Sequence, residues 1–192
     1  MTEHQEYKAK LLKELYAPYV SCTLCPLSQQ RNIVVFGRGN PDAKMLLIGE
    51  GPGRNEDLEG SPFVGRSGKL LSKTLETLKI PEPNLYITNI VKCRPPQNRA
   101  PLAQEVATCK DLLLDKQIAI IQPVLICTLG ASALTTLFNT QQGITFLRGK
   151  TFLYKNIPVF PTYHPAYILR SPSKLTLFTQ DLKNAYFKSN SI

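Results

Sequence analysis

Four of the five cysteines have a spacing that could hold a metal ion or an iron–sulfur cluster. Cys22 and Cys25 form a C-x2-C pair, whereas Cys93 and Cys109 lie much further along the chain. A C-x2-C pair presents two thiolates to one ion, and a remote pair completes a tetrahedral set if the fold brings it there. Zinc and a 4Fe-4S cluster both accept four thiolates, and a scatter of buried cysteines with one redox pair is the alternative. Cys127 lies in an apolar run and is predicted to be a core residue.

A glycine-rich turn follows the apolar run 45–48, which predicts a buried strand. The turn, Gly49-Glu50-Gly51-Pro52-Gly53, fits neither the dinucleotide-binding pattern nor the P-loop. Glycines at a strand end allow a ligand to approach the backbone, and small molecules bind outside the carboxyl ends of parallel strands. The turn supplies one carboxylate, Glu50, and one aromatic, Phe63, follows it. A tight turn with a solvated acid is the alternative.

Two further polar side chains lie near predicted strand ends. Asn89 is close to the carboxyl end of the run 85–91, and His164 follows the run 157–160 in a proline-rich segment. A lone histidine is more often structural than catalytic. Because His4 lies in a short terminal segment, His164 is the only credible catalytic histidine.

The elements that must position these residues alternate between strand and helix. Apolar runs predict four sheet strands at 45–48, 85–91, 124–129 and 157–160, preceded by a further strand at 32–36. Helical spacing of leucines predicts helices over 5–20, 67–78 capped by Ser67, 103–119, from 130 onward, and a last helix around 175–187. This alternation predicts an α/β fold, a three-layer αβα sandwich with a central, mainly parallel four-stranded sheet. Its length predicts one domain over residues 1–192.

The charge is uneven. The chain has a net charge of +9, and residues 140–192 hold seven Lys and Arg residues against Asp181 alone. A basic face fits a polyanion such as DNA, with generic surface lysine as the alternative. Since no apolar stretch approaches the roughly 20 residues of a membrane span and no signal pattern is present, we expect no membrane partner and a cytoplasmic location. In that reducing compartment disulfides are not expected.

These features together resemble a known family. The chain is similar to the family 4 uracil-DNA glycosylases, the iron–sulfur branch of the uracil-DNA glycosylase superfamily. The resemblance rests on the spaced cysteines and on the segments Gly49–Gly53, Ser61–Gly65, Thr88–Pro96 and His164–Arg170. It implies a monofunctional DNA repair enzyme that flips uracil out of single- or double-stranded DNA, hydrolyses its N-glycosidic bond and leaves an abasic site for base excision repair. We expect the enzyme to be a monomer.

The resemblance also implies a role for each site residue. Phe63 would stack on uracil, Asn89 would read its edge, backbone groups of Glu50 and Gly51 would contact the base or water, and His164 would face uracil O2. Glu50 would at most assist the attacking water. Cys22, Cys25, Cys93 and Cys109 would hold a 4Fe-4S cluster. The segment Tyr167-Ile168-Leu169-Arg170 would be a DNA-binding loop whose apolar residues fill the space left by the flipped base, unless Ile168 and Leu169 simply pack beneath the last helix.

Three other functions compete with this one. A glycosylase that crosslinks to the abasic site resembles family 4 but has an additional basic loop, which this chain lacks after Cys93. A non-catalytic iron–sulfur DNA-binding module would not need Phe63, Asn89 and His164 together. A zinc-stabilised nucleotide-binding protein is disfavoured because the phosphate-binding patterns fail.

Overall fold

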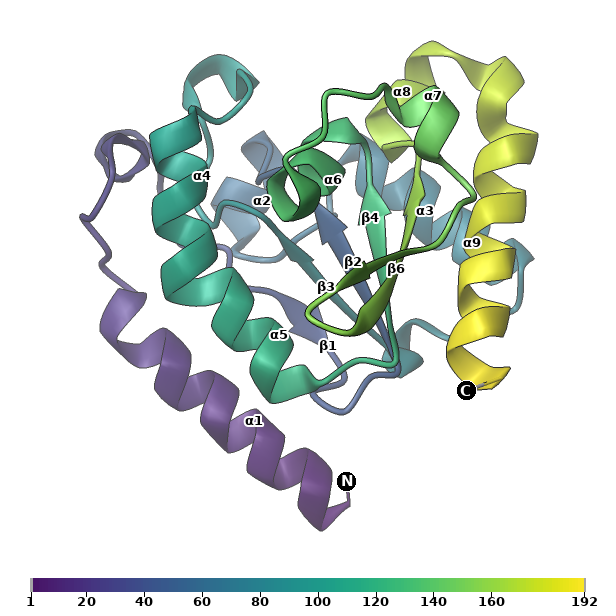
Figure 1. Ribbon diagram of the computed structural model, residues 1–192. Helices are drawn as coiled ribbons and strands as arrows, with labels where there is room; N and C mark the ends of the chain where they lie inside the picture. Colours follow the sequence, from purple (N-terminus) through teal and green to yellow (C-terminus); the bar gives the residue numbers. More distant parts are fainter. Residues whose placement is uncertain (1, 192) are drawn as a thin grey trace.

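A computed structural model describes residues 2–191 and contains a six-stranded sheet in the order β1-β3-β2-β4-β6-β5 (Figure 1). Its strands are β1 (Arg38–Gly39), β2 (Met45–Gly49), β3 (Leu85–Asn89), β4 (Leu125–Leu129), β5 (Phe152–Tyr154) and β6 (Ile157–Thr162). The four inner strands β3, β2, β4 and β6 run parallel, and the edge strands β1 and β5 pair antiparallel. The mainly parallel αβα sandwich is confirmed, with six strands in place of four.

The four predicted sheet strands correspond to these inner strands, but the strand predicted at 32–36 is wrong. That segment is irregular, and its Val35 N–H donates to the Lys92 carbonyl outside any ladder. The edge position beside β3 belongs instead to the two-residue β1. The apolar residues Val34, Val35 and Phe36 are buried, as an apolar run predicts, but they do not pair with a neighbouring strand.

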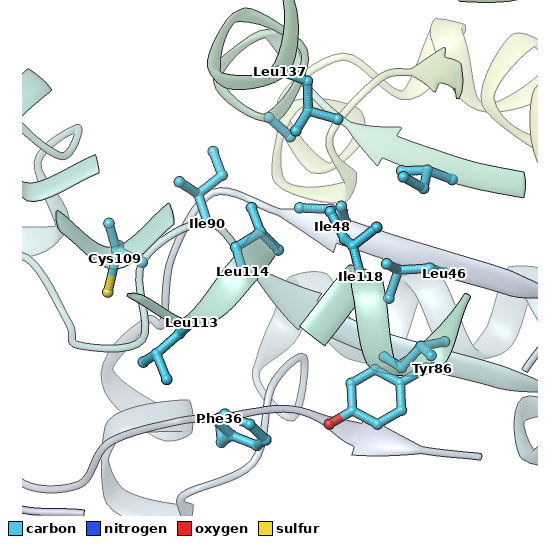
Figure 2. Packing of buried hydrophobic residues seen from close by; sticks show 14 of the residues in the cluster. Phe36, Leu46, Ile48, Tyr86, Ile90, Cys109, Leu113, Leu114, Ile118 and Leu137 are labelled. Atoms are coloured by element: carbon cyan, nitrogen blue, oxygen red, sulfur yellow. The ribbon is translucent and has the colours of Figure 1, made fainter. Parts of the chain in front are cut away.

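Helices cover both faces of the sheet. They are α1 (Glu3–Tyr16), α2 (Arg54–Glu59), α3 (Arg66–Thr77), α4 (Ala103–Cys109), α5 (Asp115–Ile121), α6 (Ala131–Phe138), α7 (Ile144–Leu147), α8 (Pro165–Arg170) and α9 (Leu175–Ser191). Alternate residues of β2 divide between two cores because successive strand side chains point to opposite faces. Leu46 and Ile48 pack with Ile118 of α5 and Leu137 of α6 (Figure 2), and α1 belongs to the same core. Met45 and Leu47 pack with α3, α8 and α9.

Several helix boundaries differ from the predictions. Helix α3 begins at Arg66 with Gly65 as its N-cap, so the predicted cap at Ser67 is wrong. The helix predicted over 103–119 is interrupted by a π-helical turn at Lys110–Leu114. The segment predicted as a DNA-binding loop belongs to the short helix α8, and the short helix α2 lies where no helix was predicted. None of the helices within residues 2–191 is long and apolar enough to cross a membrane.

Candidate active site

A cavity of about 590 Å³ opens at the carboxyl ends of the four parallel strands. Its lining includes all five residues predicted to bind uracil, namely Glu50, Gly51, Phe63, Asn89 and His164. Glu50 and Gly51 follow β2, Asn89 ends β3, and His164 lies two residues beyond β6. The parallel topology therefore gathers residues that are more than a hundred positions apart in the chain.

Asn89 lines the cavity next to Phe63. Its side chain is 2 % exposed, and its buried Oδ1 has no hydrogen-bond partner. Asn89 pairs with Gly49 across the β2–β3 ladder, and a Cβ at Gly49 would lie 2.4 Å from Asn89 Oδ1 and 2.5 Å from the Phe63 ring. Only glycine leaves this space open. Because an unpaired buried acceptor is unfavourable in the free protein, Asn89 is prepared to accept a hydrogen bond from a ligand.

Phe63 has a left-handed backbone, with φ of 55°. This conformation is rare for an aromatic residue. The side chain is 6 % exposed, and its ring centroid lies 5.8 Å from that of His164, at an interplanar angle of 33°. The two rings thus form adjoining walls of the cavity.

His164 caps α8 and has a defined tautomer. Its Nδ1 accepts the N–H of Ala166 at 3.1 Å, so the proton of a neutral ring lies on Nε2. The pKa of His164 is lowered to about 4, mainly by burial; Arg170 adds to this shift, and Glu56 acts in the opposite direction. The imidazole is therefore neutral near pH 7 and offers Nε2–H as a hydrogen-bond donor.

Glu50 is held by a partner that the sequence analysis missed. The Ser132 hydroxyl, in the first turn of α6, donates to Glu50 Oε2. Ser132 also lines the cavity, as does Glu56 of α2. The position of Ser132 just after β4 could have been found by the same strand-end rule that indicated Asn89. The side-chain space of Gly51 is filled by Val91, which would lie 2.8 Å from a Cβ there.

The DNA-binding segment is only partly as predicted. Residues 167–170 belong to α8 and not to a loop. Tyr167 and Arg170 line the cavity. Ile168 is 2 % exposed and packs in the core with α9, so it is not available as a wedge, whereas Leu169 is 40 % exposed. The predicted loop and the wedge role of Ile168 are therefore wrong.

The four spaced cysteines lie near one another. The pKa of Cys93 is raised to about 12, mainly by burial; Arg31 opposes this shift, and the other three thiols add to it. Cys22 and Cys25 are half-buried, and Cys109 is buried and accepts the Lys92 N–H at 3.4 Å. Within residues 2–191, no three His, Cys, Asp or Glu side chains are arranged to hold a metal ion. Cys127 is fully buried in the core, as predicted.

Comparison with known proteins identifies the class to which this fold and site belong. Residues 36–189 match the family described as the uracil DNA glycosylase superfamily, and the chain belongs to it. The chain is 42 % identical over 181 residues to the type-4 uracil-DNA glycosylase of Sulfurisphaera tokodaii, covering 90 % of this chain and 82 % of the relative. It is 44 % identical over 170 residues to the type-4 enzyme of Thermotoga maritima, covering 87 % and 88 %. Within the superfamily, the chain is a member of the type-4 uracil-DNA glycosylases.

Proposed function

We propose that this protein flips uracil out of DNA and hydrolyses its N-glycosidic bond, leaving an abasic site for base excision repair. The observation that carries this proposal is the buried, unpaired Oδ1 of Asn89 beside the Phe63 ring. An amide presents an acceptor and a donor side by side, which match N3–H and O4 of uracil, whereas cytosine presents the opposite pattern. Its relatives are named type-4 uracil-DNA glycosylases, which supports the same substrate.

His164 stabilises the leaving base in this proposal. The bond between C1′ of the sugar and N1 of uracil breaks with both electrons moving to the base, so negative charge develops on the uracil oxygens. The neutral imidazole donates from Nε2 to O2, since Nδ1 is occupied by Ala166. A fixed donor in a pocket shielded from water stabilises such an anion strongly. A water molecule then attacks C1′ and leaves its hydroxyl group there. The proton that this water loses is taken up by the uracil anion or by solvent.

The remaining residues orient the reactants. Phe63 stacks on the flipped base, and Glu50, fixed by Ser132, assists the attacking water. Gly51 offers no side chain to orient water, so cleavage is largely dissociative, with His164 supplying most of the side-chain electrostatics. Tyr167 and Arg170 at the cavity rim contact the DNA backbone, and Leu169 is the remaining candidate wedge. Among the described cavity-lining residues there is no lysine for Schiff-base chemistry, which supports a monofunctional enzyme.

Cys22, Cys25, Cys93 and Cys109 are proposed to hold a 4Fe-4S cluster. Their thiols act on one another electrostatically, and Arg31 acts on Cys25 and Cys93. The Nε of Arg31 is buried without a partner, which fits a sulfur acceptor nearby. When bound, the cluster supplies a structural cross-link between the N-terminal segment, the loop after β3 and the end of α4.

Single-turnover uracil release from a defined oligonucleotide tests the proposal. Wild type should release uracil and leave thymine in a matched oligonucleotide. Asn89→Ala and His164→Ala should each slow release by about 10² to 10³-fold, the range for loss of one oriented group in a preorganised site. Glu50→Gln should slow release by about tenfold at most, because Glu50 only assists water. A folded, cluster-loaded wild type that releases no uracil would favour the non-catalytic DNA-binding module.

A further inference from the structure

We propose that Glu56 is a positioning residue that sets the width of the uracil slot, the part of the cavity between the Glu50–Gly51 turn and the Phe63 turn, by joining these two turns. The inference rests on the proposed function. Glu56 lies in α2 and is 7 % exposed. Its Oε2 accepts the Gly53 N–H at 3.1 Å, whereas its Oε1 accepts the N–H groups of Val64 and Gly65 at 3.0 and 2.8 Å. One carboxylate therefore bridges the turn that carries Glu50 and Gly51 to the turn that carries Phe63.

Helix capping accounts for only one of these three hydrogen bonds. A glutamate at the third position of a helix commonly reaches back to the N-cap N–H, as Glu56 does to Gly53. The bonds to Val64 and Gly65 lie eight and nine residues away in sequence and belong to the start of α3. They add a long-range connection that capping of α2 does not require.

The second turn needs such a connection because of Phe63. Its positive φ is unfavourable for an aromatic side chain and persists only where the surroundings hold it. The two N–H groups bound by Glu56 Oε1 follow Phe63 directly. On the other side, Arg38 Nε donates to the Pro62 carbonyl at 3.0 Å. Without the carboxylate, the turn can relax and the Phe63 ring can move away from Asn89 and His164.

The neighbouring residue Asp57 provides a matched control. It lies on the same helix, is fully buried and also accepts several hydrogen bonds. Its carboxylate faces the other way, since Oδ1 accepts the Asn32 N–H at 2.9 Å and Oδ2 accepts from Asn32 Nδ2 at 2.6 Å. Asp57 is thus as buried as Glu56, but its carboxylate makes no hydrogen bond to either of the two turns that form the slot.

The test compares Glu56→Gln with Asp57→Asn in the full chain. Base-specific binding is measured as the ratio of Kd values for two oligonucleotides, one with thymidine and one with 2′-fluoro-2′-deoxyuridine, an analogue that resists cleavage. Both variants should lower Tm. Glu56→Gln should also reduce the affinity ratio and slow uracil release by about 10 to 100-fold, because small misplacements have large effects on reactive geometry. Asp57→Asn should leave the affinity ratio and the rate of uracil release within about twofold of the wild-type values, a much smaller change than in Glu56→Gln.

Equal affinity ratios and release rates in Glu56→Gln and wild type would overturn the inference, as would an equal loss in Asp57→Asn. If Glu56→Gln does not fold, Gly53→Ala replaces it, because the added Cβ would lie 2.7 Å from Glu56 Oε2 and meets no other residue. An unchanged ratio in Gly53→Ala would then be decisive against the role. A wild type that neither releases uracil nor prefers the analogue would overturn the proposed function itself. If wild type does both and only the results for the variants differ from those expected, the role of Glu56 alone is overturned.

Discussion

At the scale of single residues, the proton on His164 decides how the site works. A charged imidazole would attract the leaving base more strongly, but in the resting protein the half-buried ring would then lose favourable hydration. The structure favours the neutral form, because burial outweighs the opposing effect of Glu56 on the pKa. The site thus relies on a positioned neutral donor.

This arrangement predicts a pH-dependent loss of stability. The pKa of His164 is about 4 in the folded protein and 6.5 in its ordinary state, so between these values the unfolded chain binds more protons. The free energy of unfolding should therefore fall as the pH drops from about 6.5 to 4. His164→Gln should lack this loss, which we expect to be about 1–2 kcal/mol because solvent screens the half-buried ring. The free energy of unfolding of both proteins is measured by denaturant unfolding at several pH values. If it falls equally in wild type and in His164→Gln as the pH drops, the expectation is contradicted.

Residue roles were predictable to different degrees. Asn89 and His164 follow apolar runs, and parallel strands bring their carboxyl ends to one edge, so these side chains could be placed from sequence. The role of Glu56 could not be predicted from sequence. Its partners Val64 and Gly65 come within hydrogen-bonding distance only because the fold places the N-termini of α2 and α3 next to each other. Ile168 was misplaced because an apolar side chain fits a wedge and a core equally well, and only its packing in the core with residues of α3 and α9 distinguishes the two.

At the scale of elements, α3 approaches the Phe63 turn so closely that residue 68 has no room for a side chain. Gly68 lies in the first turns of α3, and a Cβ there would lie 2.0 Å from the Phe63 carbonyl oxygen. Helix α3 can therefore lie against this turn only because residue 68 has no side chain. The position of Phe63 therefore depends on α3, whose Leu71 belongs to the same core cluster as Phe63.

Gly68→Ala should therefore destabilise the protein although alanine is the better helix former. Alanine gains about 1 kcal/mol in helix propensity, but the clash should outweigh it and leave a net loss of about 1–3 kcal/mol. Uracil release should also slow, because Phe63 is displaced. Lys73→Ala, on the exposed face of the same helix, is the control and should change neither the unfolding midpoint nor the release rate appreciably.

Elements were predictable where the sequence pattern reflects burial. The inner strands β2, β3 and β4 are fully buried, and β6 is buried over its last four residues, so these strands appear as largely apolar runs. The edge strands β1 and β5 have two and three residues, too few to give any pattern. The short helix α8 begins with a proline soon after a strand and has only six residues. Its sequence therefore shows no helical periodicity from which a helix could be predicted.

At the scale of the whole molecule, the proposed cluster joins segments that the sheet does not hold together. Cys25→Ala and Cys109→Ala should each lose iron and acid-labile sulfide and lower the Tm. Cys127→Ala is the control, because this thiol is buried in the core on the other face and should cost stability without loss of iron. Wild type should be brown, with absorbance near about 400 nm. A colourless protein that contains stoichiometric zinc would contradict the iron–sulfur assignment.

The π-helical turn between α4 and α5 has a consequence for how related chains can differ in length. Its Lys110 carbonyl accepts the Asp115 N–H, one residue further than in an α-helix, so the turn contains an insertion. Removing one residue would restore a regular helix and rotate Cys109 by about 100° relative to α5. If Ile118 and Ile121 of α5 then still faced the core, the thiol of Cys109 would point in a different direction than it does now. A homologue with a deletion at this point must either lack the thiol or pack α5 differently.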